Sequence, residues 1–541
     1  MRGNDSLNGI KLRCYAGTTG IILAMDVVPS RRKNLLGFAI ERERLPGGQW
    51  KWLQGLLRFP GQARAINTPV DSNLAPFQKF RWSDYCVYPD TKYKYKVTGV
   101  YGTPSQLKYV SGPEVEVKTE PLYKGAHQII FNRAAAASQA YKRKFGSTNP
   151  DDTNDPRSKD ARVWLSRGLQ ERLYSFLNRA LDSNWALDIA IYEFELPEIA
   201  DILEKARRQG AQIRVIYHAK EGDEQTEINT LTLIPLKTND KLPRQTNAIF
   251  HHKFCILSRV TPDGRREPQS VLTGSTNFTP NGVYRQANVV HIIENKAIAR
   301  NYLELFEELF QGADPRETKS YINTKHPVKP GSIPQAVFSP RSKFSDIQEV
   351  AAIVQKASRD LVFCTTFNLH PDICQALLGT PASDIIRYGL QNSRTKITGT
   401  HRYGQFTATA MFKSGLEGFL KETTAGQKGN ILVHLKTILT DFSTNNPTVI
   451  TGSNNFSANA SSRNDENMLI IGGETSVADV YACEMMRLYD HYRFRYNQRA
   501  KGQRGPKKRL TLYDSDEWTA RYFQKGTLPY LERIRFSGGN A

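Results

Sequence analysis

The sequence predicts an α/β protein built from two pseudo-symmetric α-β-α halves, which follow an all-β sandwich. The chain has 541 residues, which is too long for one ordinary core. Near residue 160 the hydrophobic pattern changes from short strands alone to strands that alternate with helices. One ordered set of polar motifs then occurs twice, which indicates an internal duplication.

Residues 1–122 are predicted to form the all-β sandwich. Apolar and aromatic runs at 20–25, 36–40 and 92–97 are separated by turn residues. In the last run, tyrosines and a valine alternate with lysines, which is the two-residue period of a half-buried strand. The run 91–97 resembles a strand of a fibronectin type III-like sandwich, so we expect that fold here.

A polar segment at 146–156 favours a linker over residues 123–160. After it, Leu165, Leu169, Leu173 and Leu177 recur at steps of four and form one stripe of a predicted helix.

Strands are then predicted at 187–192 and 212–217, with a helix at 197–208 between them. This order indicates an α/β layer with a mainly parallel sheet. The same order returns with a helix at 346–357, a strand at 361–366 and a helix after Pro371. We therefore expect one half over 161–330, a second over 331–500, and a basic tail over 501–541.

The duplicated motifs consist of a histidine and a lysine two residues apart, a Gly-Ser-x-Asn turn, and an asparagine that precedes an apolar strand. The residues of the first copy are His251, Lys253, Ser275, Asn277 and Asn288, and those of the second copy are His434, Lys436, Ser453, Asn455 and Asn467. Two such copies in one chain point to a single constellation rather than to isolated surface strands.

The spacing has a physical reason. Residues i and i+2 of a strand face the same side, so each histidine shares a cavity with its lysine. Burying a histidine beside a lysine is unfavourable unless an anion lies between them, and a phosphate would satisfy both groups. The serine and asparagine of each turn add hydrogen-bond donors. The pattern therefore predicts a phosphate site.

These blocks resemble the HKD motifs of the phospholipase D superfamily, whose members cleave or exchange phosphodiesters in lipids and nucleic acids. The resemblance covers roughly residues 160 to 500. The second motif is complete, with Asp441 five residues after its lysine, whereas Ser258 takes that place in the first. In the family this aspartate mainly supports local structure. An acidic residue, Glu466, precedes Asn467, while Ala287 precedes Asn288.

The resemblance implies a mechanism that uses no metal and no other cofactor. His251 would attack the phosphorus and form a phosphohistidine, while His434 would protonate the leaving oxygen and later deprotonate water. Glu466 would orient one of these imidazoles and raise its pKa. The side chains expected to bind or orient the phosphate are Lys253, Lys436, Asn277, Asn455, Ser275, Ser453 and Asp441.

The substrate is predicted from charge. Lys and Arg total 74 against 53 Asp and Glu, a net charge of +21, with a pI near 9.6. Such an excess favours a polyanionic partner, as does the basic run 493–509 with aromatics at its start. We therefore expect a nuclease that acts on DNA or RNA. A phospholipase D or cardiolipin synthase-like enzyme acting on phospholipid is the alternative, and a catalytically decayed nucleic-acid-binding module is the third interpretation.

No signal peptide and no transmembrane segment are evident. Six widely spaced cysteines are best explained as buried reduced thiols. These features predict a cytoplasmic protein. Because both motifs lie in one chain, a monomer would suffice for one active site, and the oligomeric state is left open.

Overall fold

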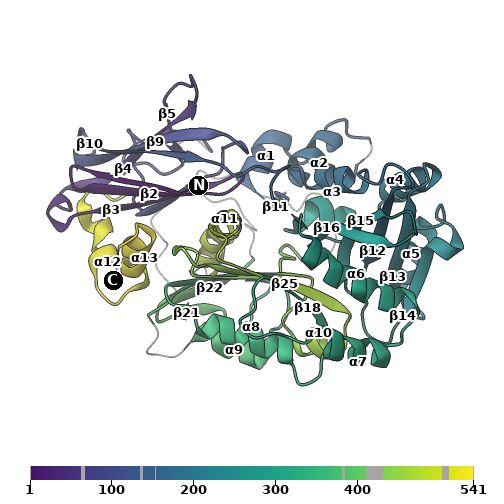
Figure 1. Ribbon diagram of the computed structural model, residues 1–541. Coiled ribbons are helices and arrows are strands. Elements are labelled where there is room, and N and C mark those ends of the chain that lie inside the picture. Colours follow the sequence, from purple (N-terminus) through teal and green to yellow (C-terminus); the bar gives the residue numbers. More distant parts are fainter. Residues whose placement is uncertain are drawn as a thin grey trace.

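The computed structural model describes residues 2–62, 67–134, 138–152, 154–379, 384–409, 431–501 and 511–539. Figure 1 shows a β-sandwich, two α/β halves and a short C-terminal helical segment. The C-terminal segment lies against both the sandwich and the second half (Figure 1). The sequence therefore predicted the fold class correctly.

The N-terminal part is all-β, as expected. Its antiparallel strands pair in the orders β1–β2–β3–β8 and β10–β9–β4–β5. The elements are β1 (Arg2–Leu7), β2 (Ile10–Ala16), β3 (Ile21–Val27), η1 (Pro29–Arg31), β4 (Leu35–Leu45), β5 (Lys51–Trp52), β6 (Gln54–Gly55), β7 (Val70–Asp71), β8 (Arg81–Asp84), β9 (Lys92–Thr103) and β10 (Gln106–Lys118). In β9 the alternating Tyr93 and Tyr95 are buried in the core, which is the outcome that the two-residue period predicts.

The first half contains a mixed sheet in the order β11–β17–β16–β15–β12–β13–β14. Its strands are β11 (His127–Phe131), β12 (Trp185–Ile191), β13 (Gln212–Ala219), β14 (Lys241–Gln245), β15 (Lys253–Val260), β16 (Arg266–Gly274) and β17 (Val289–Ile293). Its helices are α1 (Gln139–Phe145), α2 (Ser158–Ser166), α3 (Leu169–Leu177), α4 (Pro197–Arg208), α5 (Glu224–Thr232), η2 (Thr238–Asp240), η3 (Asn281–Arg285), α6 (Lys296–Phe310) and α7 (Pro315–Lys325).

The second half repeats this arrangement in the order β18–β25–β24–β23–β19–β20–β22–β21. Its strands are β18 (Gln335–Ser339), β19 (Asp360–Thr365), β20 (Ile386–Gln391), β21 (Gly399–His401), β22 (Gly404–Ala408), β23 (Thr437–Thr440), β24 (Thr448–Gly452) and β25 (Glu466–Gly472). Its helices are α8 (Ser345–Gln355), α9 (Pro371–Leu378), α10 (Ala458–Ser462) and α11 (Thr475–Lys501). The matching strand orders show the predicted pseudo-symmetry.

The expectation of a mainly parallel sheet was wrong. In each half only the pairs around the strand–helix–strand unit are parallel, namely β12–β13–β14 and β19–β20–β22. The motif-bearing strands β15–β17 and β23–β25 follow as antiparallel meanders. Short hairpin connections allow only antiparallel pairing, so the turn at 262–264 already contained this information.

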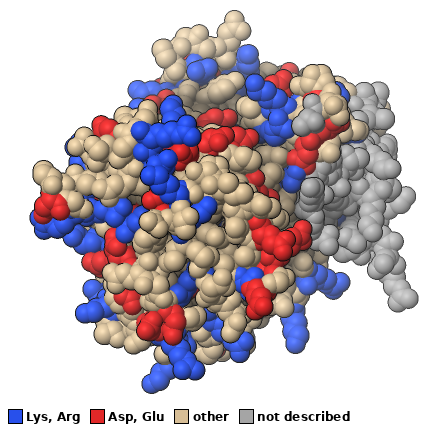
Figure 2. Space-filling model, turned by 90° about the vertical axis from the view of Figure 1, so that its right-hand side faces the viewer, with Lys and Arg blue, Asp and Glu red and all other residues tan. Residues whose placement is uncertain are grey.

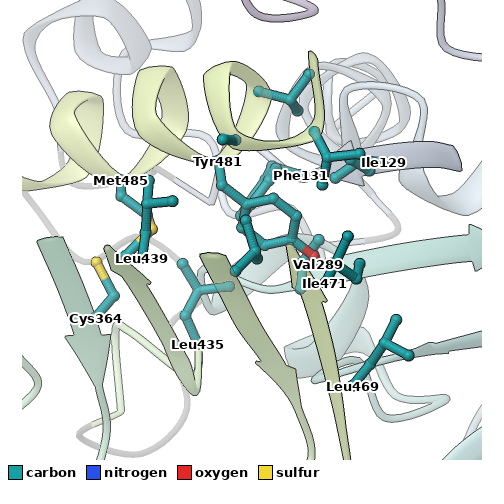
Figure 3. Close-up of a cluster of buried hydrophobic side chains, with 14 of the residues drawn as sticks. Ile129, Phe131, Val289, Cys364, Leu435, Leu439, Leu469, Ile471, Tyr481 and Met485 are labelled. Carbon is teal, nitrogen blue, oxygen red and sulfur yellow. The ribbon is translucent and has the colours of Figure 1, made fainter. Parts of the chain in front are cut away.

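The core between the halves is covered by helix α11. Tyr481 and Met485 point from α11 toward strands of the second half, beside Leu435, Leu439 and Ile471 (Figure 3). The side chains of β11 and β17 from the first half join the same buried cluster. A single apolar core therefore holds the two sheets together.

Two predicted boundaries need correction. The range 123–160 is not a linker, because it contains β11, which pairs with β17 inside the first sheet. The polar segment is also held at Asp151, since the Tyr284 hydroxyl donates to the Asp151 carboxylate at 2.8 Å. The leucine stripe belongs to α2 and α3 rather than to one helix. Arg167 and Gly168 have positive φ and break it, yet all four leucines are buried.

The range 501–541 is likewise not a simple tail. Its described part, 511–539, forms η4 (Asp516–Thr519), α12 (Ala520–Phe523) and α13 (Leu528–Phe536). Trp518 is buried in the sandwich core and its indole N–H donates to the Leu35 carbonyl at 2.7 Å. The Tyr15 hydroxyl donates to the Phe536 carbonyl at 2.8 Å. On the other side, the Phe536 ring packs against that of Phe442 in the second half, with centroids 5.0 Å apart, so the segment joins the sandwich to the second half.

Among the residues that the structure describes, no helix is long and apolar enough to cross a membrane. Cys14, Cys255, Cys364 and Cys483 are buried as expected, whereas Cys86 is exposed and Cys374 is partly exposed. Basic and acidic side chains are interspersed on the face that the first half presents in Figure 2. The net positive charge is therefore not gathered into one patch on that face.

We expect Trp518→Ala to lower the free energy of unfolding by about 3 to 5 kcal/mol, because it removes a buried aromatic side chain and its hydrogen bond. Urea denaturation followed by tryptophan fluorescence and circular dichroism would measure this change. Tyr109→Ala, at a half-exposed tyrosine of β10, is the control and should change stability by less than about 1 kcal/mol. Equal stability of the two variants would show that the C-terminal segment does not support the sandwich.

Candidate active site

The candidate site lies where backbone from the two halves meets. The His251 amide donates to the Asp465 carbonyl at 2.8 Å, and the Asp465 amide donates to the Ile249 carbonyl at 3.1 Å. The other half makes the same pair: the His434 amide donates to the Ala287 carbonyl at 2.9 Å, and the Ala287 amide donates to the Leu432 carbonyl at 2.8 Å. We call these parallel bridges the seam. Each histidine is fixed by the half that does not contain it.

The seam brings the two predicted histidines together. The ring centroids of His251 and His434 are 6.4 Å apart and the ring planes are nearly perpendicular, at 83°. Each residue is only 6% exposed. At this separation one phosphorus atom can lie between the two rings within reach of both.

His251 is held by a carboxyl group from the other half. Its Nδ1 lies 2.9 Å from Glu466 Oε2, and the Asn464 amide donates to Oε1 of the same carboxyl group at 3.1 Å. The sequence left open which imidazole Glu466 touches, and the geometry assigns it to His251. A proton between Nδ1 and the carboxyl group leaves Nε2 with a free lone pair.

His434 is held by neutral acceptors instead. Its Nδ1 lies 3.0 Å from Asn288 Oδ1 and 3.1 Å from the Ser275 carbonyl oxygen. Because a carbonyl oxygen can only accept, Nδ1 must carry the proton. The Ser275 hydroxyl also donates to Asn288 Oδ1 at 2.8 Å. These contacts fix the ring and its tautomer, and they leave Nε2 able to gain and lose a proton.

The structure corrects the predicted register of the two copies by one residue. The Ser275 amide donates to the Val289 carbonyl, and the equivalent Ser453 amide donates to the Asn467 carbonyl. Val289 is thus the counterpart of Asn467, and Asn288 is the counterpart of Glu466. The sequence comparison aligned the two asparagines because it had no information on strand pairing. The Asn467 amide in fact donates to the Thr273 hydroxyl, and its Oδ1 lies near His252.

Both lysines are buried beside the histidines. Lys253 and Lys436 donate to the carbonyl oxygens of His251 and His434, at 2.9 and 2.7 Å. Burial lowers the pKa of Lys253 to about 7, and burial together with Lys253 lowers the pKa of Lys436 well below its usual value. Burial and the same lysines lower the pKa of both histidines well below the usual range. The site therefore tolerates little positive charge.

Burial acts on Glu466 in the opposite direction and raises its pKa to about 8, against the effect of the two lysines. The carboxyl group and His251 thus form a closely coupled pair that is best described as sharing a proton. Such a pair keeps the imidazole neutral and oriented before an anion binds.

Sequence reasoning missed Glu193, which follows β12. Its Oε2 accepts a hydrogen bond from the Asn277 side-chain amide, and its charge interacts with both lysines. The neighbouring Tyr192 has its ring 5.3 Å from that of His251, and Lys253 Nζ lies 5.1 Å from its centroid. A usable signal was present, because Tyr192 ends a predicted buried strand of the α/β layer and Glu193 directly follows it.

The family described as "Cardiolipin synthase, PLD-like domain" matches the chain twice, at residues 175–310 and 350–489, which together are about half of its length. Each match contains one histidine of the pair. The chain belongs to the phospholipase D superfamily. The similarity thus confirms the resemblance that the duplicated motifs indicated.

Curated relatives match about one quarter of the chain. The mitochondrial cardiolipin hydrolase of Mus musculus is 24% identical over 161 residues, 29% of this chain and 66% of that protein. The Xenopus tropicalis protein of the same name is 27% identical over 150 residues, 27% of this chain and 62% of that protein. The chain therefore spans less than two thirds of the length of these relatives.

Two solved structures are also similar to the chain, at low sequence identity. The phosphatidylserine synthase of Haemophilus influenzae has a TM-score of 0.42 at 12% identity, covering 62% of this chain and 89% of that one. The phospholipase D family member Nuc of Salmonella typhimurium has a TM-score of 0.21 at 20% identity, covering 25% and 86%.

The superfamily's motif aspartate does not bind or orient phosphate in this chain, which corrects the prediction for Asp441. Asp441 lies at the far end of β23 and accepts hydrogen bonds from the amides of Ser358, at 2.9 Å, and Arg359, at 2.7 Å. It therefore fixes the start of β19. In the first half, the Asn184 amide donates to Asp182 at 2.8 Å in an Asx turn that precedes β12. Asp182 thus fixes the start of β12, the strand equivalent to β19, although Ser258 takes the place of the motif aspartate.

The remaining phosphate candidates are placed less uniformly. Ser453 is buried, and its hydroxyl lies 3.3 Å from Asn467 Oδ1. Asn455 is partly buried, and its Oδ1 has no hydrogen-bond partner among the described residues. Asn277 Oδ1 also has no hydrogen-bond partner among the described residues. Unpaired buried amide oxygens are costly, so these two side chains are held at an energetic cost to the fold.

We expect tungstate, an unreactive phosphate analogue, to bind the site and raise the melting temperature. Because the pKa of Lys253 is about 7 and a bound anion favours the protonated lysine, affinity should fall as the pH rises above 7. One proton corresponds to a loss of up to about tenfold per pH unit. Calorimetry between about pH 6 and 8 measures this dependence. Lys253→Met should weaken the dependence, and Lys436 and the histidines supply the part that remains, whereas the exposed control Lys356→Met should leave it unchanged. Affinity independent of pH would contradict the assignment.

Proposed function

We propose that this protein is a metal-independent phosphodiesterase that cleaves nucleic acid through a phosphohistidine intermediate. The observation that carries the proposal is the contact between two imidazoles from different halves, each with its own buried lysine. Enzymes of the superfamily cleave or transfer phosphodiesters, and this arrangement supplies the groups that such a reaction needs.

In the first step, Nε2 of His251 attacks the phosphorus and forms a P–N bond, while the P–O bond to the leaving group breaks. His434, charged on arrival of the anionic substrate, gives its Nε2 proton to the leaving oxygen. Glu466 accepts a hydrogen bond from Nδ1–H of His251 and stabilises the positive charge that grows on that ring.

In the second step, His434 takes a proton from water, the water oxygen attacks phosphorus, and the P–N bond breaks to restore His251. Lys253 and Lys436 balance the charge on the non-bridging oxygens in both steps. Asn455 would donate its side-chain N–H to the substrate, whereas Asn277 would first exchange its hydrogen bond to Glu193 for one to the substrate.

The roles of the two histidines differ because their partners differ. A carboxyl group on His251 stabilises a cationic, phosphorylated ring, which suits the nucleophile. The amide of Asn288 on His434 adds no charge, so that ring can lose its proton easily and suits the acid and base.

Nucleic acid is the proposed substrate because of the net charge of +21 on the chain, which favours a polyanion. A phospholipid is the second candidate, and the names of the curated relatives, mitochondrial cardiolipin hydrolases, favour it. Loss of catalysis is the weakest reading, because both histidine–lysine pairs are complete and in contact.

We expect the purified protein to cleave DNA or RNA in excess EDTA, since no step requires a metal. His251→Ala and His434→Ala should each reduce the rate by at least about 10³-fold. His370→Ala, outside the seam, is the matched control. Parallel assays with cardiolipin and phosphatidylglycerol vesicles test the second candidate. Lipid cleavage with nucleic acid left intact would overturn the choice of substrate, and loss of all activity in EDTA with the fold intact would overturn the mechanism.

A substrate with a good leaving group distinguishes the roles of the two histidines. Because p-nitrophenolate leaves without a proton, His434→Asn should still form the intermediate from bis(p-nitrophenyl) phosphate. We expect a burst of one p-nitrophenolate per protein, followed by slow turnover. His251→Asn should show no burst. Rapid-mixing absorbance and mass spectrometry of the phosphorylated protein measure these outcomes, and a burst in the His251 variant alone would reverse the assigned roles.

A further inference from the structure

A groove on the N-terminal sandwich lies apart from the histidines. It has a volume of about 980 Å³ and is lined by strands β5, β6 and β8, by α1 and by Phe494 near the end of α11. Tyr481 of α11 contacts His291 at the junction of the halves, and Phe494 follows it by 13 residues. At 1.5 Å per residue the two positions are roughly 20 Å apart. None of the histidines or lysines of the candidate active site lines the groove, so the two are separate.

Aromatic side chains form its walls. Trp50 is 38% exposed, and Trp52 and Trp82 are partly buried. The Trp82 ring is stacked on Phe77 with centroids 3.7 Å apart and planes 14° apart, which fixes its orientation. Phe494 lines the groove from α11. Fixed, partly open aromatic rings of this kind are suited to stack against planar groups.

Cations accompany the aromatic rings. Lys51, Lys79 and Arg143 are exposed and line the groove. The two carboxylates in the lining are already engaged, because Asp84 pairs with Arg42 at 2.7 Å and Asp71 accepts from Gln54 at 2.8 Å. The groove therefore presents net positive charge next to its aromatic rings.

A second pocket adjoins the groove and is also rich in basic side chains. It shares Lys79 and Phe494 with the groove and is lined further by Arg81, Arg493 and Arg521. Asp490 and Glu532 also line it, and both are paired with Arg81, at 2.7 and 2.8 Å. The aromatic groove thus leads into a site with an excess of arginine.

We propose that this groove binds a single-stranded segment of nucleic acid outside the active site. The bases stack on Trp50, Trp52 and Phe494, and the phosphates contact Lys51, Lys79 and Arg143. A single strand is favoured over a duplex because only unpaired bases offer their faces. Neither an acyl chain nor a neutral sugar carries negative charge that could pair with these cations. The inference rests on the proposed function and extends it, since it assigns a place where substrate is held during cleavage.

The test measures binding of a fluorescent single-stranded oligonucleotide of about twelve nucleotides, which is a site size that such grooves accept. The full chain carries His251→Asn so that no cleavage occurs. Trp50→Ala and Trp52→Ala should each weaken binding about tenfold. Tyr109→Ala, at an exposed tyrosine of the same sandwich outside the groove, should leave affinity unchanged.

A second pair of variants avoids aromatic residues that support the fold. Lys51→Gln and Arg143→Gln change only exposed charges, and each should reduce the salt dependence of binding by about 0.7 in the log–log slope. Unchanged affinity and slope in all groove variants would overturn the inference, and so would a stronger affinity for the matching duplex.

The outcomes also distinguish this inference from the proposed function. If the groove variants lose binding but the wild-type protein cleaves no nucleic acid, the groove assignment stands and the nuclease proposal fails. If nucleic acid is cleaved while the groove variants bind it as well as their parent does, the nuclease proposal stands and the groove assignment fails.

Discussion

The seam between the halves is the constraint on which the candidate site depends. Its hydrogen bonds tie the backbone of each histidine to the residue that precedes Glu466 or Asn288 in the other half. The position of each imidazole and that of its Nδ1 partner are therefore set by the same bridge. A buried ion pair between Arg244 and Asp465, 3.1 Å apart, holds one side of this seam. Neither half alone can present a histidine with its partner.

The duplication makes the two motif copies similar, whereas the proposed reaction needs two histidines with different roles. The two copies share their backbone bridges, their lysines and their Gly-Ser turns, yet they differ at the partner of Nδ1. Glu466 can carry charge and Asn288 cannot. Glu193 adds a second asymmetry, because the strand equivalent to β12 in the second half, β19, is followed at that place by the half-exposed Phe367. One scaffold used twice thus gives two rings with different Nδ1 partners, a carboxyl group for His251 and an amide for His434.

The sequence predicted what repeats along the chain and missed what depends on pairing across it. The spacing of His251 and Lys253, the helix at 197–208 and the alternation in β9 are local features that periodicity reports directly. The register of Asn288 against Glu466 could not be predicted, because it follows from a strand partner remote in sequence. Asp441 was misassigned for the same reason, since proximity along the chain put it near the lysine while the strand carries it to the opposite end. The C-terminal segment looked like a tail because only its basic composition was considered, although Trp518 and Phe536 were present as signs of a buried segment.

The electrostatics of the site explain why such a cluster can exist inside a folded protein at all. Two lysines and two histidines at this depth would be strongly destabilising if all were charged, and burial instead lowers their proton affinity. The carboxyl groups of Glu193 and Glu466 balance part of the charge that remains. An arriving phosphodiester changes this balance, because its negative charge favours protonation of the same groups. Binding would then generate the acid that the first step requires, and in its absence His434 would remain neutral and unable to donate. Activation by the substrate's own charge is therefore a consequence of burying the cluster, and it needs no moving part.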